Sequence, residues 1–176
     1  MTSLSIIPTN QNTVEWGKLK SHWMTLLSAT QKTYIGQGVA LVNLKTKKHI
    51  GERETLAIGT WTYLELAIPN TLGIGLPSSQ TTKLAGHELE YLDEATTDIP
   101  TEALEELAKQ WAIAGYTYKV MSSGGRGKHE FGLMLALTIA LAELSGGYVH
   151  VIETNPFTEN EGLYHPDQFR NFHPKY

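Results

Sequence analysis

The stretch YTYKVMSSGGRGKHEFGLMLALTIALAELSGGYVHVI, residues 116–152, decides the fold class. It begins and ends with short β-type runs, 116–121 and 148–152, and its middle is a glycine-rich loop followed by an apolar helix over 129–145. A helix that is apolar almost all round is predicted to lie deep in the structure. A strand–helix–strand unit of this length places its two strands parallel in one sheet.

Two amphipathic helices are expected outside this unit. Apolar residues recur at helical spacing after Thr13, a good N-cap, and again between Pro100 and Gly115. The residues on these apolar faces are Trp16, Leu19, Trp23, Leu26 and Leu27, and then Leu104, Leu107, Ala108 and Trp111. Short β-type runs at 39–44, 56–66, 72–76 and 89–92 are separated by turn signals, which favours antiparallel strands. The fold class is therefore α+β or α/β, with a mixed, mostly antiparallel sheet packed against the buried helix and the two amphipathic helices.

Length and composition bound the remaining possibilities. With 176 residues and 41% hydrophobic residues, the chain is expected to form a single globular domain over 1–176, with a surface-wrapping C-terminal tail over 153–176 that holds one short helix at 167–171. The absence of cysteine excludes disulfides and thiolate zinc sites. The longest apolar stretch, 131–144, is shorter than the roughly 20 residues that span a bilayer. A cytoplasmic protein without membrane partners is predicted, and a pI near 6.0 gives no electrostatic case for nucleic-acid binding.

An acidic block between Gly86 and Glu106 is the clearest candidate site. It contains eight of the eighteen carboxylates and no Lys or Arg. The carboxylates are those of Glu88, Glu90, Asp93, Glu94, Asp98, Glu102, Glu105 and Glu106. The last three fall near a helix N-terminus, where the helix macrodipole stabilises negative charge. A solvated face and a docking surface for a positively charged partner are both open interpretations, whereas acid–base catalysis would require burial that the neighbouring sequence does not offer.

The glycine-rich loop over 122–129 is the alternative candidate site. Backbone N–H groups at a helix start could hold a phosphate group. The residues in question are Gly124, Gly125, Arg126, Lys128 and His129. The spacing departs from a P-loop, because Ser122 stands where its first Gly is needed and His129 where it has Ser or Thr. A plain turn before a buried helix is the competing interpretation. The seven histidines do not have metal-ligand spacing, so neither a metal nor another cofactor is predicted.

Residues 116–170 resemble the immunity proteins of bacterial polymorphic and type VI secreted toxins. The resemblance rests on the long apolar helix 131–144, the break Ser145-Gly146-Gly147, the strand after it, and the segment Tyr164-His165-Pro166-Asp167-Gln168-Phe169. It implies a non-enzymatic protein that binds one cognate toxin domain and blocks its active site. It carries over no individual functional residue and does not indicate the toxin's activity.

Three functional hypotheses follow. The first is a non-enzymatic immunity-type inhibitor that neutralises a basic toxin domain through the acidic block. The alternative is a small enzyme or ligand-binding protein that holds a phosphorylated compound at the glycine-rich loop. A third is a structural subunit that associates with itself.

Overall fold

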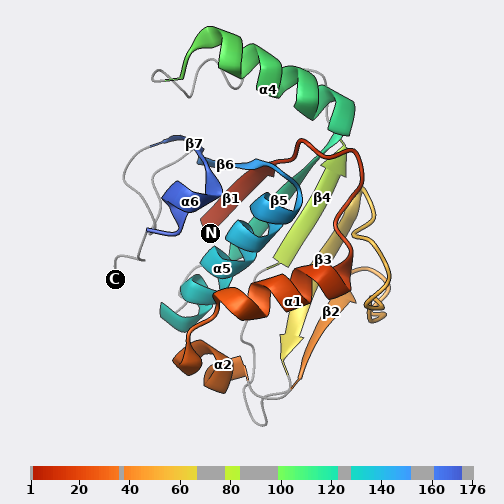
Figure 1. Ribbon diagram of the computed structural model, residues 1–176. Helices are drawn as coiled ribbons and strands as arrows, with labels where there is room; N and C mark the ends of the chain where they lie inside the picture. Colours follow the sequence, from red (N-terminus) through yellow and green to blue (C-terminus); the bar gives the residue numbers. More distant parts are fainter. Residues whose placement is uncertain are drawn as a thin grey trace.

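The computed structural model of the chain describes residues 2–35, 38–66, 78–83, 99–122, 128–151 and 161–171. Within these ranges the main element is one sheet of seven strands in the order β2-β3-β4-β5-β1-β6-β7 (Figure 1). Every pair of neighbours is antiparallel. The strands are β1 Thr2–Ile7, β2 Val39–Asn43, β3 Thr60–Leu66, β4 Ser78–Lys83, β5 Tyr116–Ser122, β6 Tyr148–Val151 and β7 Gly162–Tyr164.

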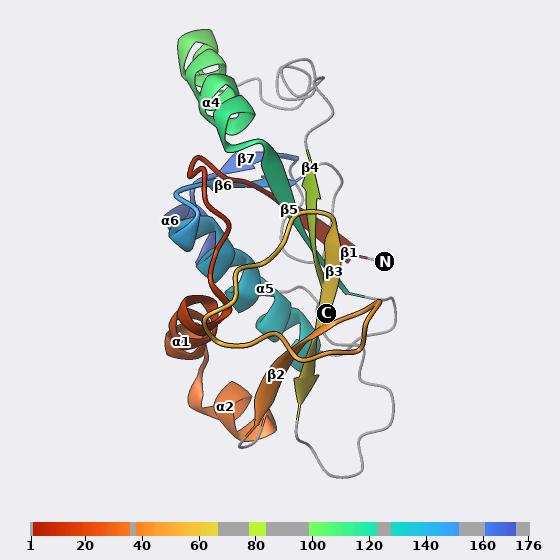
Figure 2. The same cartoon turned by 90° about the vertical axis from the view of Figure 1, so that its right-hand side faces the viewer.

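The helices are distributed unequally around this sheet. One face carries α1, α2, α5 and α6, whereas α4 lies across one end of the sheet (Figures 1 and 2). Their bounds are α1 Trp16–Leu26, α2 Ala29–Ile35, α4 Thr101–Ala114, α5 Lys128–Leu144 and α6 Pro166–Phe169. The predicted combination of a mostly antiparallel sheet with a buried helix and two amphipathic helices is confirmed, and the fold is α+β.

The unit β5–α5–β6 has the predicted arrangement, with one addition. Both β5 and β6 are antiparallel to β1, so they are parallel to each other. The N-terminal strand β1 lies between them and fills the space that the crossover leaves. Strand β1 is not among the elements predicted from the sequence, because Thr2–Ile7 is short and only partly alternating. The elements β4, α2 and β7 were not predicted either, and β7 brings part of the predicted surface tail into the sheet.

The main core lies between the sheet and the helices α1 and α5. Its largest fully buried side chains include Trp16, Trp23, Tyr116 and Tyr118. The indole Nε1–H of Trp23 donates a hydrogen bond to the carbonyl oxygen of Leu133 at 3.2 Å, which ties α1 to α5. The hydroxyl of Tyr118 accepts a bond of 2.8 Å from the backbone N–H of Val14, and burial raises the pKa of Tyr118 far above its ordinary value. This phenol therefore stays neutral and holds the segment that enters α1.

The predicted N-cap of the first helix is wrong. The helix begins at Trp16 with Glu15 in the capping position, and no side chain caps it. The backbone N–H groups of Trp16 and Gly17 instead donate to the carbonyl oxygens of Glu54 and Glu52, at 2.9 and 2.7 Å. A Cβ on residue 17 would lie 2.7 Å from the Glu52 oxygen, so Gly17 permits this approach. The predicted strand 56–66 begins at Thr60 instead. The backbone N–H of Leu56 donates to the carbonyl oxygen of Val14 at 2.9 Å, so Leu56 pairs with the segment before α1 and lies outside β3.

Candidate partner-binding surface

The structure places part of the acidic block on α4. Glu102, Glu105 and Glu106 are exposed on this helix. The other predicted docking residues, Glu88, Glu90, Asp93, Glu94 and Asp98, lie outside the described residues. Their contribution to an acidic face therefore stays a prediction. The described part of the predicted site is α4.

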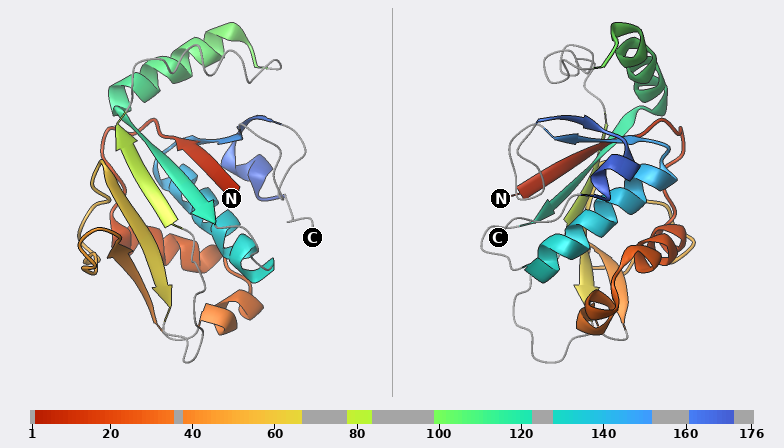
Figure 3. Two further views of the ribbon diagram at one scale, coloured as in Figure 1. Left: turned by 180° about the vertical axis from the view of Figure 1, so that it is seen from behind. Right: turned by 60° about the vertical axis from the view of Figure 1, so that its left-hand side comes forward.

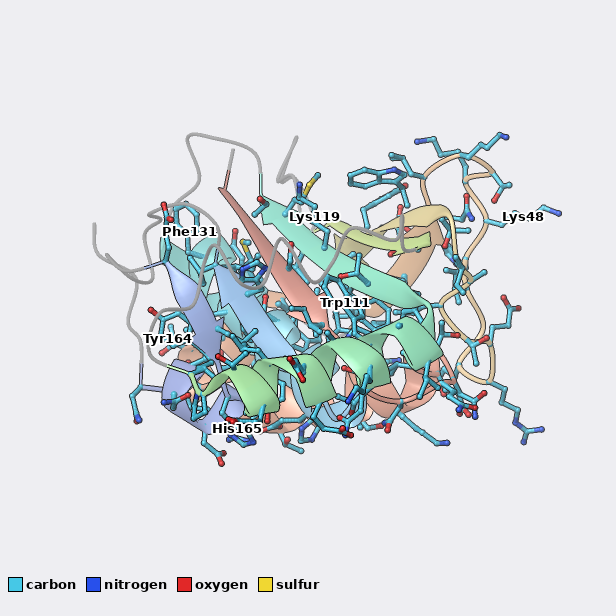
Figure 4. All side chains as sticks on the ribbon, turned by 90° about the horizontal axis from the view of Figure 1, so that it is seen from above. Lys48, Trp111, Lys119, Phe131, Tyr164 and His165 are labelled. Carbon is cyan, nitrogen blue, oxygen red and sulfur yellow. The ribbon has the colours of Figure 1, made fainter. Side chains whose placement is uncertain are left out.

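One stripe of α4 attaches the helix to the sheet. Leu107, Ala108 and Trp111 form a small hydrophobic cluster with Ile7 at the end of β1, and partly buried Tyr148 and Leu163 pack against it. Ile7 belongs to this cluster while its neighbour Ile6 belongs to the main core, so the two clusters lie on opposite sides of β1. Figure 4 shows Trp111 between α4 and the strands, and its indole N–H donates to the carbonyl oxygen of Tyr116 at 3.0 Å.

The two ends of α4 agree with the sequence analysis. The helix follows Pro100 and ends at Gly115, which adopts a left-handed conformation with φ of 77°. The Gly115 N–H donates to the carbonyl oxygen of Trp111 at 2.9 Å. Because this conformation is costly for residues with a Cβ, glycine fixes the point at which the chain turns from α4 into β5.

The outward face of α4 is acidic along its first half. Glu102 lies in the first turn, where the helix dipole favours negative charge. The Glu106 carboxylate accepts a hydrogen bond from the Gln110 side chain at 3.0 Å. Within the described parts of the chain, neither Glu102 nor Glu105 has an ion-pair partner, and Lys109 is the one cation on this helix. The carboxylates are thus available to a positively charged partner.

Only part of the glycine-rich loop lies within the described residues. Gly124, Gly125 and Arg126 lie outside the described residues, whereas Lys128 and His129 form the first turn of α5, with side chains that are not described. The predicted passage from a strand through this loop into the buried helix is confirmed for the backbone on either side. Phosphate binding at the loop stays a prediction.

An ion-pair network that sequence reasoning missed joins three helices. Glu143 near the end of α5 accepts hydrogen bonds from His22 of α1 and from Arg170 beside α6, with the Arg170 Nε at 3.0 Å. Burial raises the pKa of the Glu143 carboxyl, but the bonds and charges of Arg170 and His22 outweigh this and hold its pKa below the ordinary value. The partners are 121 and 27 residues from Glu143 in sequence, so no local motif could have indicated them.

The described surface includes open depressions beside the helices. A cleft of about 550 Å³ is lined mainly by polar residues of the segment 10–15, with Lys18, Thr55 and Leu144. A smaller groove of about 250 Å³ lies between the end of α5 and α6, beside Glu143 and His165. No three His, Asp or Glu side chains gather as a metal site in the part of the chain that the structure describes. His150 is buried in β6, and this burial lowers the pKa of His150 to about 4.

Comparison of the chain with protein-family models, curated proteins and solved structures found no match in any of the three. Among the helices that the structure describes, none has the length and apolarity needed to cross a bilayer. The function must therefore be argued from the surface of the molecule itself.

Proposed function

We propose that the protein is a non-enzymatic immunity protein that binds and neutralises a basic toxin domain through the acidic face of α4 and the residues before it. The observation that carries this proposal is the set of exposed carboxylates on α4, two of them without an ion-pair partner among the described residues. The helix is attached along one stripe only, so its outward face is available for docking. The resemblance of residues 116–170 to toxin immunity proteins points in the same direction.

The chemistry of such a face suits an inhibitor of a cationic protein. Toxin domains that act on nucleic acids or nucleotides are commonly basic, and carboxylates on an exposed helix face can pair with their positive charges. Opposite charges also accelerate the encounter of the two proteins and suppress wrong partners. Because exposed charges are screened by salt, binding through this face should weaken as ionic strength rises.

The test begins with the tagged full chain as bait in a lysate of the source cells. Each captured basic protein is then expressed in cells with and without this chain, and growth is measured. We expect one captured protein to arrest growth when expressed alone and to be harmless when the chain is present. If none of the captured proteins impairs growth when expressed alone, the immunity function is contradicted.

Charge reversal tests the surface separately. Glu102→Lys combined with Glu105→Lys should weaken binding of the captured protein by about tenfold or more, measured by titration calorimetry. The matched control is Glu54→Lys with Glu65→Lys, which makes the same change of net charge at exposed positions outside α4 and its hydrophobic cluster and should alter the affinity by about twofold or less. Equal affinities for both variants would remove α4 from the docking surface while leaving immunity itself standing.

A further inference from the structure

The loop between β2 and β3 carries a surface of opposite sign to α4. Lys45, Lys47 and Lys48 are all exposed there (Figure 4 shows Lys48 at the far end of the loop). Lys47 has φ of 59° and its ammonium group lies 5.5 Å from the centre of the Tyr63 ring, so it is part of the loop's own structure. Lys45 and Lys48 have no ion-pair partner within the described ranges. We call residues 44–49 the basic loop; the exposed Glu52 and Glu54 follow it in the same connection between β2 and β3.

Exposed aliphatic side chains lie both on α4 and on the connection between β2 and β3. In the part of the chain that the structure describes, three large hydrophobic side chains are exposed: Leu44 at 45%, Ile58 at 49% and Ile113 at 62%. Leu44 belongs to the basic loop, Ile58 to the later part of the same β2–β3 connection, and Ile113 lies near the C-terminal end of α4. Residues 105, 109 and 113 follow one another at i, i+4 spacing, so Ile113 lies on the same face as Glu105. The segment around Lys45 and Lys48 therefore combines exposed aliphatic carbon with positive charge, and the outward face of α4 combines it with negative charge apart from Lys109.

We propose that copies of this chain associate head to tail, with the acidic face of α4 on one copy docked on the basic loop of the next. The charge complementarity between these two surfaces of one chain selects a second copy as the occupant. Carboxylates of one copy meet ammonium groups of the other, while Ile113 and the pair Leu44 and Ile58 supply the apolar contact that excludes water. Figure 3 shows α4 and the β2–β3 side from two further directions, and the two surfaces belong to separate parts of the molecule.

The contact is heterologous, because the two docked surfaces differ. Such contacts extend into chains unless the rotation between copies closes a ring. Association of this kind weakens as salt rises, since its charges are exposed. A basic toxin domain would compete with the basic loop for α4, and this one consequence rests on the proposed function, whereas the self-association does not.

Sedimentation velocity of the full chain over a range of concentrations tests the proposal. We expect the weight-average sedimentation coefficient to rise with concentration at about 0.01 M salt and to fall back towards the monomer value at about 1 M. A concentration-independent monomer at low salt would overturn the proposal.

Charge-swapped variants locate the contact. The loop variant is Lys45→Glu with Lys48→Glu, which spares the structural Lys47, and the helix variant is Glu102→Lys with Glu105→Lys, which spares Glu106 and its bond to Gln110. Each variant alone should lower the association constant by about tenfold or more, because its two surfaces then carry like charge. An equal mixture should associate again, because each loop then meets an α4 of opposite sign. The control, Lys18→Glu with Lys32→Glu, should associate like the wild type. A mixture no more associated than the separate variants would overturn the proposed contact.

Discussion

The helices α5 and α4 are neighbours in sequence but are attached to the sheet in opposite ways. Most side chains of α5 from Leu133 to Ala142 are buried, and they contact the sheet on one side and α1 on the other. Only one stripe of α4 is buried, and it meets the main core only through Ala114 at its C-terminal end, whereas Leu107, Ala108 and Trp111 pack in a separate cluster. Figure 2 shows α5 held between α1 and the sheet while α4 extends beyond them.

This difference distinguishes a structural framework, formed by α1, α5 and the central strands, from α4 as a surface element. Because α5, α1 and the central strands share one core, a change in any of them affects the stability of the whole domain. A change in α4 acts on a small cluster and can be absorbed by local opening of the helix. Surfaces that must diversify to match a partner are better placed on such an element than on the framework.

The largest expected effect comes from removing a framework side chain. Trp23→Ala deletes a fully buried indole and the hydrogen bond that it donates to Leu133, so it should lower the free energy of unfolding by about 3–5 kcal/mol. Urea denaturation followed by circular dichroism measures this change. Ile113→Ala on the exposed face of α4 is the control, with an expected change within about 0.5 kcal/mol. A loss below about 1 kcal/mol for Trp23→Ala would contradict the assignment of α1 and α5 to one cooperative core.

A smaller and local effect is expected for the corresponding tryptophan of α4. Trp111→Ala should cost about 2 kcal/mol, because detachment of α4 limits the loss that the rest of the domain experiences. Hydrogen exchange measured by mass spectrometry should show faster exchange across 101–114, with little change in α1 and α5. If protection were lost equally in all three helices, α4 would have to be counted as part of the framework.

The sequence predicted those elements whose signals are local. Each of these signals lies in one contiguous stretch of chain: the apolar run of α5, the apolar stripe of α4 and the glycine at which α4 ends. The structure confirms all three. The parallel relation of β5 and β6 also followed from the length of their connection. Local periodicity was therefore sufficient for the strand–helix–strand unit.

The features that escaped prediction depend on distant partners. Strand β1 gains its place from pairing with β5 and β6, more than 100 residues later, and the start of α1 is set by the carbonyl oxygens of 52 and 54 rather than by a capping side chain. In the candidate site, the exposure of Glu102 and Glu105 could be predicted from helical spacing. The exposure of Leu44 and Ile58 could not, because nothing in the local pattern separates an exposed aliphatic residue from a buried one.

The smallest of the three predicted losses of stability tests how the C-terminal helix α6 is attached to the framework. Glu143→Gln removes the carboxylate that Arg170 and His22 share, and should lower the free energy of unfolding by about 1 kcal/mol at neutral pH. The pKa of Glu143 is lowered in the folded protein, so its contribution is fully present above its ordinary pKa of 4.5 and is lost as the pH falls through the lower folded value. The difference between wild type and variant should therefore shrink below about pH 4.5 in urea denaturations at a series of pH values. Glu105→Gln, at an exposed position without an ion pair among the described residues, is the control and should change the free energy of unfolding at neutral pH by no more than about 0.5 kcal/mol. A pH-independent difference for Glu143→Gln would mean that shape rather than charge holds α6 in place.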